Sequence, residues 1–380
     1  MSYETYRVAD LIDEIAMGPF GSNIKVSCFV DSGVPVLNGS NLEGFSLSEK
    51  AFRFVTKEKA DSLNKANAHR GDIVITHRGT LGQIAFIPHD SRYDRYVISQ
   101  SQFRVRCNDK VLPEYLVYYF HTPIGQHKLL SNASQVGVPA LARPSSTFQQ
   151  IEVVLPELSI QKRVVEIIST IQKKIANNQE LNDNLEATAQ AVYKKMFVTD
   201  VDNTALPEGW RIVPLESISE LSAGGDKPSA YSDIQSETCN VPIFSNGIEQ
   251  EGLYGFTDKA KISDESVTVS ARGTVGYVFL REEPYVPIVR LIAVVPDTQF
   301  VTAKYLYFAL SSIDLHSTGT SQQQITVPDF KKRQILIPDK TSLDSFMEKV
   351  VPIFDSIREN KAEIKSLAAL QSNFLTLLSR

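Results

Sequence analysis

The chain has 380 residues, of which 42% are hydrophobic and 22% are charged, a composition typical of a globular protein. At roughly 150 residues per domain, this length predicts two or three domains. The formal net charge is −5, from 39 Lys and Arg against 44 Asp and Glu. No run of about 18 apolar residues occurs, so no membrane span is predicted, and Met1–Arg7 lacks the apolar core of a signal peptide.

The charge is unevenly distributed. Residues 1–158 carry 16 Lys and Arg against 16 Asp and Glu, whereas residues 199–341 carry 12 against 19 and are acidic. Because no segment is broadly basic, electrostatics alone predict weak DNA binding. Any DNA contact would depend on local patches or on a partner that supplies positive charge.

Cysteine and histidine usage argues against a metal site. Cys28, Cys107 and Cys239 are widely spaced and odd in number, and the six histidines are dispersed. Such cysteines indicate reduced thiols in a cytoplasmic protein rather than a disulfide framework. We therefore predict a cytoplasmic protein without a metal ion.

The first unit, residues 1–158, is predicted to be mixed α/β with much irregular structure. Its expected elements in chain order are an amphipathic opening over Tyr6–Ile15, a glycine loop over Gly18–Ile24, a strand over Gly33–Leu37, a polar turn over Asn38–Asn41, a helix over Lys57–Asn67, a turn, strand and loop over Gly71–Thr80, strands over Gln83–Ile87 and Tyr96–Val105, and a helix over Pro113–His121. The glycine pair Gly79 and Gly82 lacks the lysine of a phosphate loop, so it predicts a tight β-turn.

A long helix is predicted next, over Ile160–Phe197. From Val164 to Met196, seam residues recur at alternating spacings of four and three, apolar except for Asn178 and Asn182. No Pro or Gly interrupts this stretch. The pattern predicts a coiled-coil helix.

The same seam returns near the C-terminus, from Phe346 to Leu378, with Asn360 on the position of Asn178. At the same offset, Phe148–Pro156 aligns with Phe330–Pro338. A shared offset with a shared lead-in favours an internal duplication over two unrelated amphipathic helices.

Residues 199–341 repeat the first unit loosely. The matching segments are Trp210–Ile212 with Tyr6–Val8, Val241–Gly247 with Val34–Gly39, Ser270–Gly276 with Thr76–Gly82, and Lys304–Phe308 with Glu114–Tyr118. Their offsets differ, so the two units are expected to share a scaffold and to differ in loop length. One scaffold with two recognition surfaces would have this pattern.

No catalytic constellation is present in the sequence. It contains no Walker loop, nucleophile elbow or zinc-protease motif. The Asn/Asp-Pro-Pro-aromatic tetrapeptide and the glycine-rich cofactor loop of amino-methyltransferases are also missing. We therefore expect a non-catalytic protein, and a self-contained DNA methyltransferase is disfavoured.

Several motifs carry a family resemblance. They are Gly18–Ser22, Gly33–Gly39 followed by Asn41, Gly71–Thr80, Ile98–Gln102 and Leu155–Gln161. Together with the two units that each precede a long helix, they resemble the specificity subunit of a type I restriction-modification system. Departures from the family motifs lie in the second half, at Ala223–Pro228, Glu265–Arg272 and Pro338–Ser342.

The resemblance implies an α+β fold with four parts. Target-recognition domains at 1–158 and 199–341 would lie in a pseudo-two-fold arrangement, separated by long helices at 159–198 and 342–380 that form an antiparallel coiled coil. Each domain would read one half of a bipartite site in double-stranded DNA. The helices would dock two modification subunits, which carry S-adenosylmethionine, and the complex would include restriction subunits; no cofactor is expected in this chain.

The expected DNA-contacting residues have polar or cationic side chains on loops, and they are Ser22, Asn23, Lys25, Asn38, Ser40, Asn41, His77, Arg78, Gln100, Gln102, Gln135, Lys227, Ser245, Asn246, Arg272, Ser321 and Gln322. Arg78 and Arg272 precede equivalent Gly-Thr pairs, where arginine reads guanine or holds phosphate, with a structural salt bridge as the alternative. For the Asn and Ser positions, DNA contact competes with turn capping. Gln100 and Gln102 alternate with apolar residues, so only part of this segment would face a groove.

The helix register follows from pairing the two helices antiparallel about their centres. This alignment predicts that Asn182 lies opposite Asn360, with Val164 opposite Leu378 and Leu185 opposite Ile357. Because an unpaired buried amide is costly, the two asparagines would select one register. The alternative reading of the whole chain is a coiled-coil scaffold or adaptor that does not bind DNA, which the acidic second unit favours.

Overall fold

The computed structural model describes residues 3–19, 21–134, 137–199, 201–202, 204–313 and 324–378. The chain forms two compact units. Unit 1 comprises Met1–Gln179 and Lys361–Arg380, and unit 2 comprises Glu180–Asn360. The division falls inside the two long helices, α5 (Leu158–Phe197) and α8 (Lys340–Leu378), so each unit includes part of both. Among the described residues, no helix combines the length and apolar character needed to cross a membrane.

Unit 1 is built on a four-stranded antiparallel sheet. Its strand order is β2 (Ile12–Met17), β10 (Gln102–Cys107), β7 (Ile73–Thr76) and β8 (Ile84–Phe86). One face packs through Phe103 and Val105 on the helices α2 (Pro113–Phe120), α3 (Pro123–Leu130) and α4 (Pro144–Gln150). The other face contributes Val74 and Ala85 to a second core cluster with Tyr96 and Ile98.

A second sheet and two ribbons complete unit 1. The five-stranded sheet has the order β3 (Phe29–Val30), β5 (Arg53–Val55), β4 (Val34–Val36), β9 (Arg95–Val97) and β6 (Asn67–His69), and α1 (Lys57–Ser62) packs through Ala60 on its core cluster. One ribbon pairs β1 (Tyr3–Arg7) with β13 (Glu152–Pro156), which leads into α5, and the other pairs β11 (Ala133–Ser134) with β12 (Ala140–Leu141).

Unit 2 repeats this topology. Its four-stranded sheet has the order β15 (Ser219–Ala223), β21 (Ile292–Pro296), β18 (Ser266–Val269) and β19 (Val278–Arg281). Its second sheet contains β17 (Leu253–Thr257), β16 (Val241–Phe244) and β20 (Val286–Pro287). A ribbon of β14 (Arg211–Pro214) and β22 (Gln334–Ile337) leads into α8, and the helices are α6 (Ala303–Ser311) and α7 (Val327–Phe330). The predicted duplication is thus confirmed at the level of strand order.

Three details of the sequence-based expectation were wrong. The helix predicted over Lys57–Asn67 ends at Ser62, and Asn67 begins β6. Tyr96–Val105 is not one strand, because a turn closed by the Gln102 N–H to the Ser99 carbonyl (3.1 Å) separates β9 from β10, which belong to different sheets. The match of Trp210–Ile212 with Tyr6–Val8 was also wrong, by three residues. Glu152 and Gln334 are equivalent at the shared offset, and they pair with Arg7 and Pro214, so Pro214 is the residue that corresponds to Arg7.

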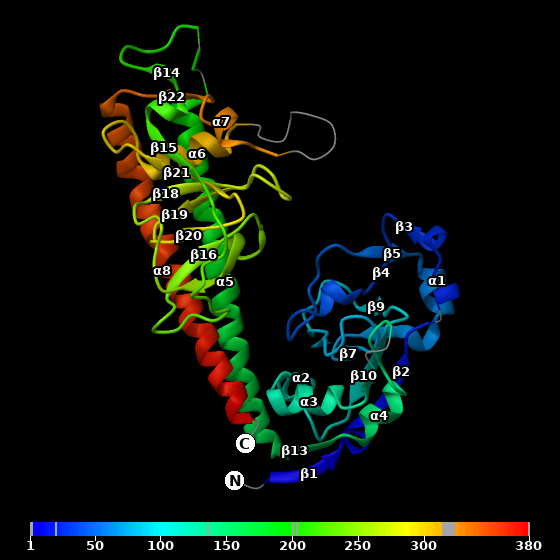
Figure 1. Ribbon diagram of the computed structural model, residues 1–380. Helices are drawn as coiled ribbons and strands as arrows, with labels where there is room; N and C mark the ends of the chain where they lie inside the picture. Colours follow the sequence, from blue (N-terminus) through cyan, green and yellow to red (C-terminus); the bar gives the residue numbers. More distant parts are fainter. Residues whose placement is uncertain are drawn as a thin grey trace. The chain divides into compact units, whose positions relative to one another are not determined.

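The two long helices run antiparallel within each unit (Figure 1). In unit 1, Nδ2 of Asn178 donates to the Glu363 carboxylate (2.7 Å), and Val164 and Leu378 belong to one core cluster. Residues later in α5 therefore lie beside residues earlier in α8, as in an antiparallel pair of helices. In unit 2, Nδ2 of Asn360 donates to Oδ1 of Asn182 at 2.8 Å, which confirms the predicted contact between the two amides.

The two long helices are held at their N-termini by different hydrogen bonds, which explains why Pro338–Ser342 departs from the motif at Leu155–Gln161. In unit 1 the buried Gln161 accepts a hydrogen bond from Leu112 N–H and donates to the Pro156 carbonyl, tying α5 to the start of α2. In unit 2, Asp339 caps α8 through Ser342 N–H (3.0 Å) and accepts from the Trp210 indole (2.7 Å). The hydrogen bond from the Ser342 hydroxyl (2.7 Å), followed by those from Ser342 N–H and the Trp210 indole, lowers the pKa of Asp339 to about 2.

Replacing both Asn182 and Asn360 by Leu is expected to raise the Tm by about 2–4 °C, because two apolar side chains at matched positions then pack in the seam. Either single replacement should lower the free energy of unfolding by about 1 kcal/mol, since the remaining half-buried amide loses its partner. Thermal and denaturant unfolding of the three variants measure both effects.

The matched control is Asn184→Leu, an exposed position on the same helix. A double variant less stable than either single variant would contradict the pairing argument.

Candidate nucleic-acid interface

Three loops of unit 1 are held together at one end of the four-stranded sheet. The residue that follows β7, His77, donates its backbone N–H to the Ser101 carbonyl (2.8 Å) and its Nε2–H to the Gln100 carbonyl (3.2 Å). The glycine loop joins them because Gly18 N–H donates to the Gln102 carbonyl (2.8 Å). Burial, with a smaller effect from the charge of Arg78, lowers the pKa of His77 and keeps its ring neutral at pH 7.

The glycine at position 18 is required by this close approach. A Cβ atom there would lie 1.8 Å from the Ser99 carbonyl oxygen, a backbone atom that cannot move aside. At Gly21 the nearest atom would be Oε1 of Gln100, at 2.2 Å. The glycine loop is therefore packed directly against the turn that contains Gln100.

Arg78 extends from a loop whose backbone is fixed on both sides. Leu141 N–H donates to the His77 carbonyl and Gly79 N–H donates to the Pro139 carbonyl, each at 2.9 Å. The Arg78 side chain is exposed, and within the described part of the chain its guanidinium has no hydrogen bond or ion pair. The structural salt bridge considered as an alternative is therefore not formed among these residues.

The equivalent loop of unit 2 is fixed in the same way. Ile325 N–H donates to the Ala271 carbonyl (3.0 Å), immediately before Arg272. The exposed Arg272 differs from Arg78 in having a neighbour, because the Gln324 amide oxygen, in the orientation that satisfies both groups, accepts from its Nε (3.2 Å) and Nη2 (3.0 Å). The two arginines thus occupy equivalent positions on the repeated scaffold.

Other expected contact residues are also exposed. Asn23 lies in the glycine loop of unit 1 and Lys25 follows it. Asn38 and Ser40 lie in the next loop, and Gln100 lies in the turn beside Gly21. Lys227 follows the corresponding loop of unit 2, with its ammonium 3.1 Å from the centroid of the Tyr231 ring. The side chain of Ser22 and the residues Gln135, Ser321 and Gln322 lie outside the part of the chain described.

Asn41 and Gln102 do not face solvent, which corrects the expectation that they contact DNA. Asn41 is 1% exposed, and its Nδ2 donates to the carbonyls of Ser48 and Lys50 at 2.9 Å each. Gln102 is fully buried, and its Oε1 accepts from Ser99 N–H (2.9 Å). Asn38 also caps its own turn, since its Oδ1 accepts from Ser40 N–H. Turn capping, the alternative considered above, therefore accounts for much of this polar stretch.

Asn246 is likewise used inside unit 2 rather than presented to solvent. Its Nδ2 donates to the Val289 carbonyl (2.6 Å) and its Oδ1 accepts from Ala271 N–H (2.7 Å). Both ends of the amide are therefore engaged, and its neighbour Ser245 is half-buried. The three tyrosines of α2, Tyr115, Tyr118 and Tyr119, are buried, as expected of core residues rather than stacking platforms.

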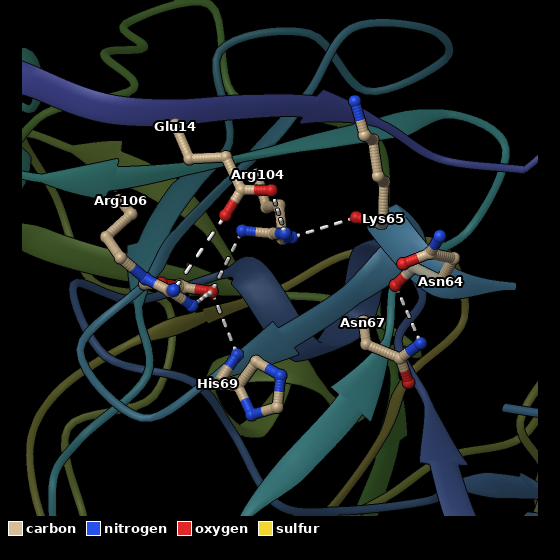
Figure 2. A network of polar contacts seen from close by, with 8 residues as sticks. Glu14, Asn64, Lys65, Asn67, His69, Arg104 and Arg106 are labelled. Carbon is tan, nitrogen blue, oxygen red and sulfur yellow. Dashed lines mark hydrogen bonds and ion pairs between the residues drawn. The ribbon is translucent and has the colours of Figure 1, made fainter. Parts of the chain in front are cut away.

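A network of arginines and carboxylates on the four-stranded sheet of unit 1 was not identified from the sequence. On β10, Arg104 donates to Glu14 (2.7 Å), to Asp72 (3.3 Å) and to the Lys65 carbonyl (2.9 Å), while Arg106 donates to Asp72 (2.9 Å); Figure 2 shows this network from close by. Asp72 is fully buried. The network links β2, β10 and the segment between the two sheets, so breaking it by removing one partner should be costly.

In unit 2, Arg281 of β19 has a comparable role. It donates to Thr268 Oγ1 (2.9 Å) and to the Glu251 carbonyl (2.6 Å), and it lies 3.6 Å above the Phe244 ring. Burial lowers the pKa of Arg281 to about 10, so it stays charged at neutral pH. The alternation of side chains along a strand predicts which face of the sheet Arg281 occupies. It does not predict that Arg281 forms an ion pair there, with Glu251.

The described residues contain no group of three or more His, Cys, Asp or Glu side chains that could hold a metal ion. The chemistry of the loops is that of hydrogen-bond donors and acceptors, with the exposed guanidinium groups of Arg78 and Arg272 among them. Such groups suit the base edges and phosphates of nucleic acids.

Comparisons with known proteins point in the same direction. The profile of the family described as the type I restriction modification DNA specificity domain matches residues 3–187 and 207–366. A putative type I specificity subunit from Mycoplasma pneumoniae is 28% identical over 206 residues, covering 53% of this chain, and the chain spans about half (56%) of that relative's length. The specificity subunit of the type I restriction enzyme MjaIX from Methanocaldococcus jannaschii is 22% identical over 408 residues, covering 97% of this chain and 90% of the relative.

A solved structure supports the fold. The crystal structure of a type I restriction-modification S subunit from M. genitalium matches with a TM-score of 0.61 at 14% sequence identity, covering 99% of this chain and 96% of that one. At this identity the likeness establishes the architecture alone.

Replacing the buried Asn41 by Ala is expected to lower the free energy of unfolding by about 1–3 kcal/mol, because buried backbone groups lose their hydrogen-bond partner. Urea unfolding measures the loss. Asn23→Ala, at an exposed position, serves as the control and should stay within about 0.5 kcal/mol of the parent protein. Equal stabilities of the two variants would contradict the structural role of Asn41.

Proposed function

Because this chain belongs to the family of type I restriction modification DNA specificity domains, we propose that it is the DNA-recognition subunit of a type I restriction-modification system. Unit 1 and unit 2 each read one half of a bipartite site in double-stranded DNA. The observation that carries this assignment is the repeated arginine-bearing loop, fixed in both units by the same backbone hydrogen bond, from Leu141 to His77 and from Ile325 to Ala271. A repeated scaffold that carries different loops is suited to reading different half-sites.

The charge of the chain indicates that it acts with partners. Unit 2 lies largely within the acidic segment, so it has little general attraction for the phosphate backbone.

The last part of α8 leaves Leu370 and Leu377 exposed by 44% and 57%, seven residues apart and therefore on one helix face. We assign this face to the docking of modification subunits, which would supply positive charge and, with S-adenosylmethionine, the methyl transfer. Restriction subunits would complete the assembly, and this chain itself would be non-catalytic.

The function is tested by selecting from random-sequence DNA with the purified chain, alone and together with its modification subunit. The complex should enrich two short sequences separated by a fixed spacer, whereas the chain alone should bind weakly at physiological salt, because no segment of its sequence is broadly basic. Exchange of residues 199–341 for the equivalent segment of a relative should change one half-site and leave the other unchanged.

Three outcomes would count against the proposal. A complex that enriches no sequence favours the adaptor function, which the acidic second unit would suit. Tight specific binding by the isolated chain would contradict the dependence on partners. If both half-sites changed in the exchange, the units would not be independent readers.

We also propose that the Asn182–Asn360 pair sets the spacer length between the half-sites. A slip of the helices by one heptad would place each amide against apolar seam residues, so the pair selects one register. The double Leu variant should therefore accept a wider range of spacers in the same selection, although it is more stable than the parent. A spacer distribution identical to that of the parent would show that the amides stabilise the seam without setting the spacing.

A further inference from the structure

A two-residue turn in unit 2 has an unusual backbone. The turn runs from Ile288 to Leu291 and is closed by Leu291 N–H donating to the Ile288 carbonyl (3.0 Å). Its central residues, Val289 and Arg290, both have positive φ values, 50° and 64°. Turns of this hand normally contain Asn and Gly, and a β-branched valine there is strained.

The scaffold does not require this strain. The equivalent turn of unit 1 is Ser99–Gln102, because Gly18 N–H donates to the Gln102 carbonyl as Gly224 N–H donates to the Leu291 carbonyl, each at 2.8 Å. The central residues of the unit 1 turn do not have positive φ values. The left-handed turn is therefore a feature of unit 2 alone, and strain that persists at one copy of a duplicated element indicates a local function.

The strained turn is held at three points. Val289 N–H donates to the Gly225 carbonyl (2.9 Å) and Arg290 N–H donates to the Gly224 carbonyl (3.0 Å). The Val289 carbonyl accepts from the Asn246 amide (2.6 Å). The backbone that carries Arg290 is thus fixed before any ligand arrives.

One side chain couples this turn to the loop of Arg272. The Asn246 amide accepts from Ala271 N–H and donates to the Val289 carbonyl, so it binds the residues immediately before Arg272 and Arg290. Both arginines are exposed. No hydrogen bond or ion pair engages the Arg290 guanidinium within the ranges the structure describes.

We propose that the Val289–Arg290 turn is a specificity-determining element of unit 2, in which Arg290 reads the edge of a guanine in the half-site bound by this unit. The inference rests on the proposed function and adds a residue that the sequence did not point to. Arginine presents a planar fork that matches O6 and N7 of guanine as well as a phosphate, and only the guanine contact depends on the base sequence. The backbone fixed at three points orients this fork before DNA binds, as a contact that reads a base requires.

The test compares the parent complex, the full chain with its modification subunit, with Arg290→Lys and Arg290→Ala in the random-DNA selection. Lys keeps the charge and loses the fork, so both variants should lower the preference for guanine at one position by roughly 10- to 100-fold. The other half-site should be unchanged. Arg333→Lys, an exposed arginine elsewhere in unit 2, is the matched control and should select the parental sequence.

The outcomes separate this inference from the proposed function. If the parent complex enriches no sequence, the proposed function fails. If the parent enriches a bipartite site and Arg290→Lys enriches the same site with the same guanine preference, the function stands and the inference is overturned. Equal weakening on all sequences by Arg290→Ala would identify a phosphate contact and would also overturn it.

A second variant tests the turn without touching the arginine. Val289→Asn places a residue that tolerates the left-handed region in the same turn. It should raise the Tm and keep the guanine preference. Loss of that preference in a stably folded Val289→Asn protein would show that the valine side chain, and not the orientation of Arg290, determines the base.

Discussion

The antiparallel pairing of α5 and α8 is the constraint on which both units depend. Each unit builds its hydrophobic core on parts of both helices, with Val164 and Leu378 in unit 1 and Tyr193 and Phe346 in unit 2. The sheets therefore cannot be considered separately from the helices that follow them. This explains why the compact units divide inside the helices rather than at their ends.

Polar residues in the seam give this pairing its register. The apolar positions alone repeat every seven residues and would tolerate a slip by one heptad. Within unit 2 the amides of Asn182 and Asn360 meet, and within unit 1 Asn178 meets Glu363. The hydrogen bond from Asn178, and then the one from Lys174, lowers the pKa of Glu363, which keeps this carboxylate ionised as the acceptor of both.

At the recognition loops, the same scaffold is held by two kinds of contact. Glycines at positions 18 and 224 allow backbone to touch backbone, since a Cβ at either would lie within 2.7 Å of a neighbouring main-chain atom. Arg104 in unit 1 and Arg281 in unit 2 tie the four-stranded sheet to the second layer. The exposed arginines Arg78 and Arg272 therefore project from rigid supports, as a site that distinguishes bases requires.

Much of the organisation was determined by the sequence itself. Heptad spacing is a local property, so it located both helices and, with the asparagines, their register. The first helix was predicted to within two residues of its start, whereas the second seam begins at Phe346, some residues after the start of α8 at Lys340. The duplication was also readable, because the shared offset links the helices and the strands that lead into them. Of the site, the sequence located the equivalent loops of Arg78 and Arg272 through their Gly-Thr pairs.

Only the tertiary structure decided which polar residues remain available for binding. Asn41, Gln102 and Asn246 have the same chemistry as Asn23 and Gln100, but burial or hydrogen bonds to backbone groups withdraw them from solvent. The hand of the Val289–Arg290 turn was equally hidden, since it opposes the local preference of both residues and is imposed by Gly224, Gly225 and Asn246. Local spacing specifies which residues can form a loop, whereas burial and backbone partners depend on contacts between segments far apart in the chain.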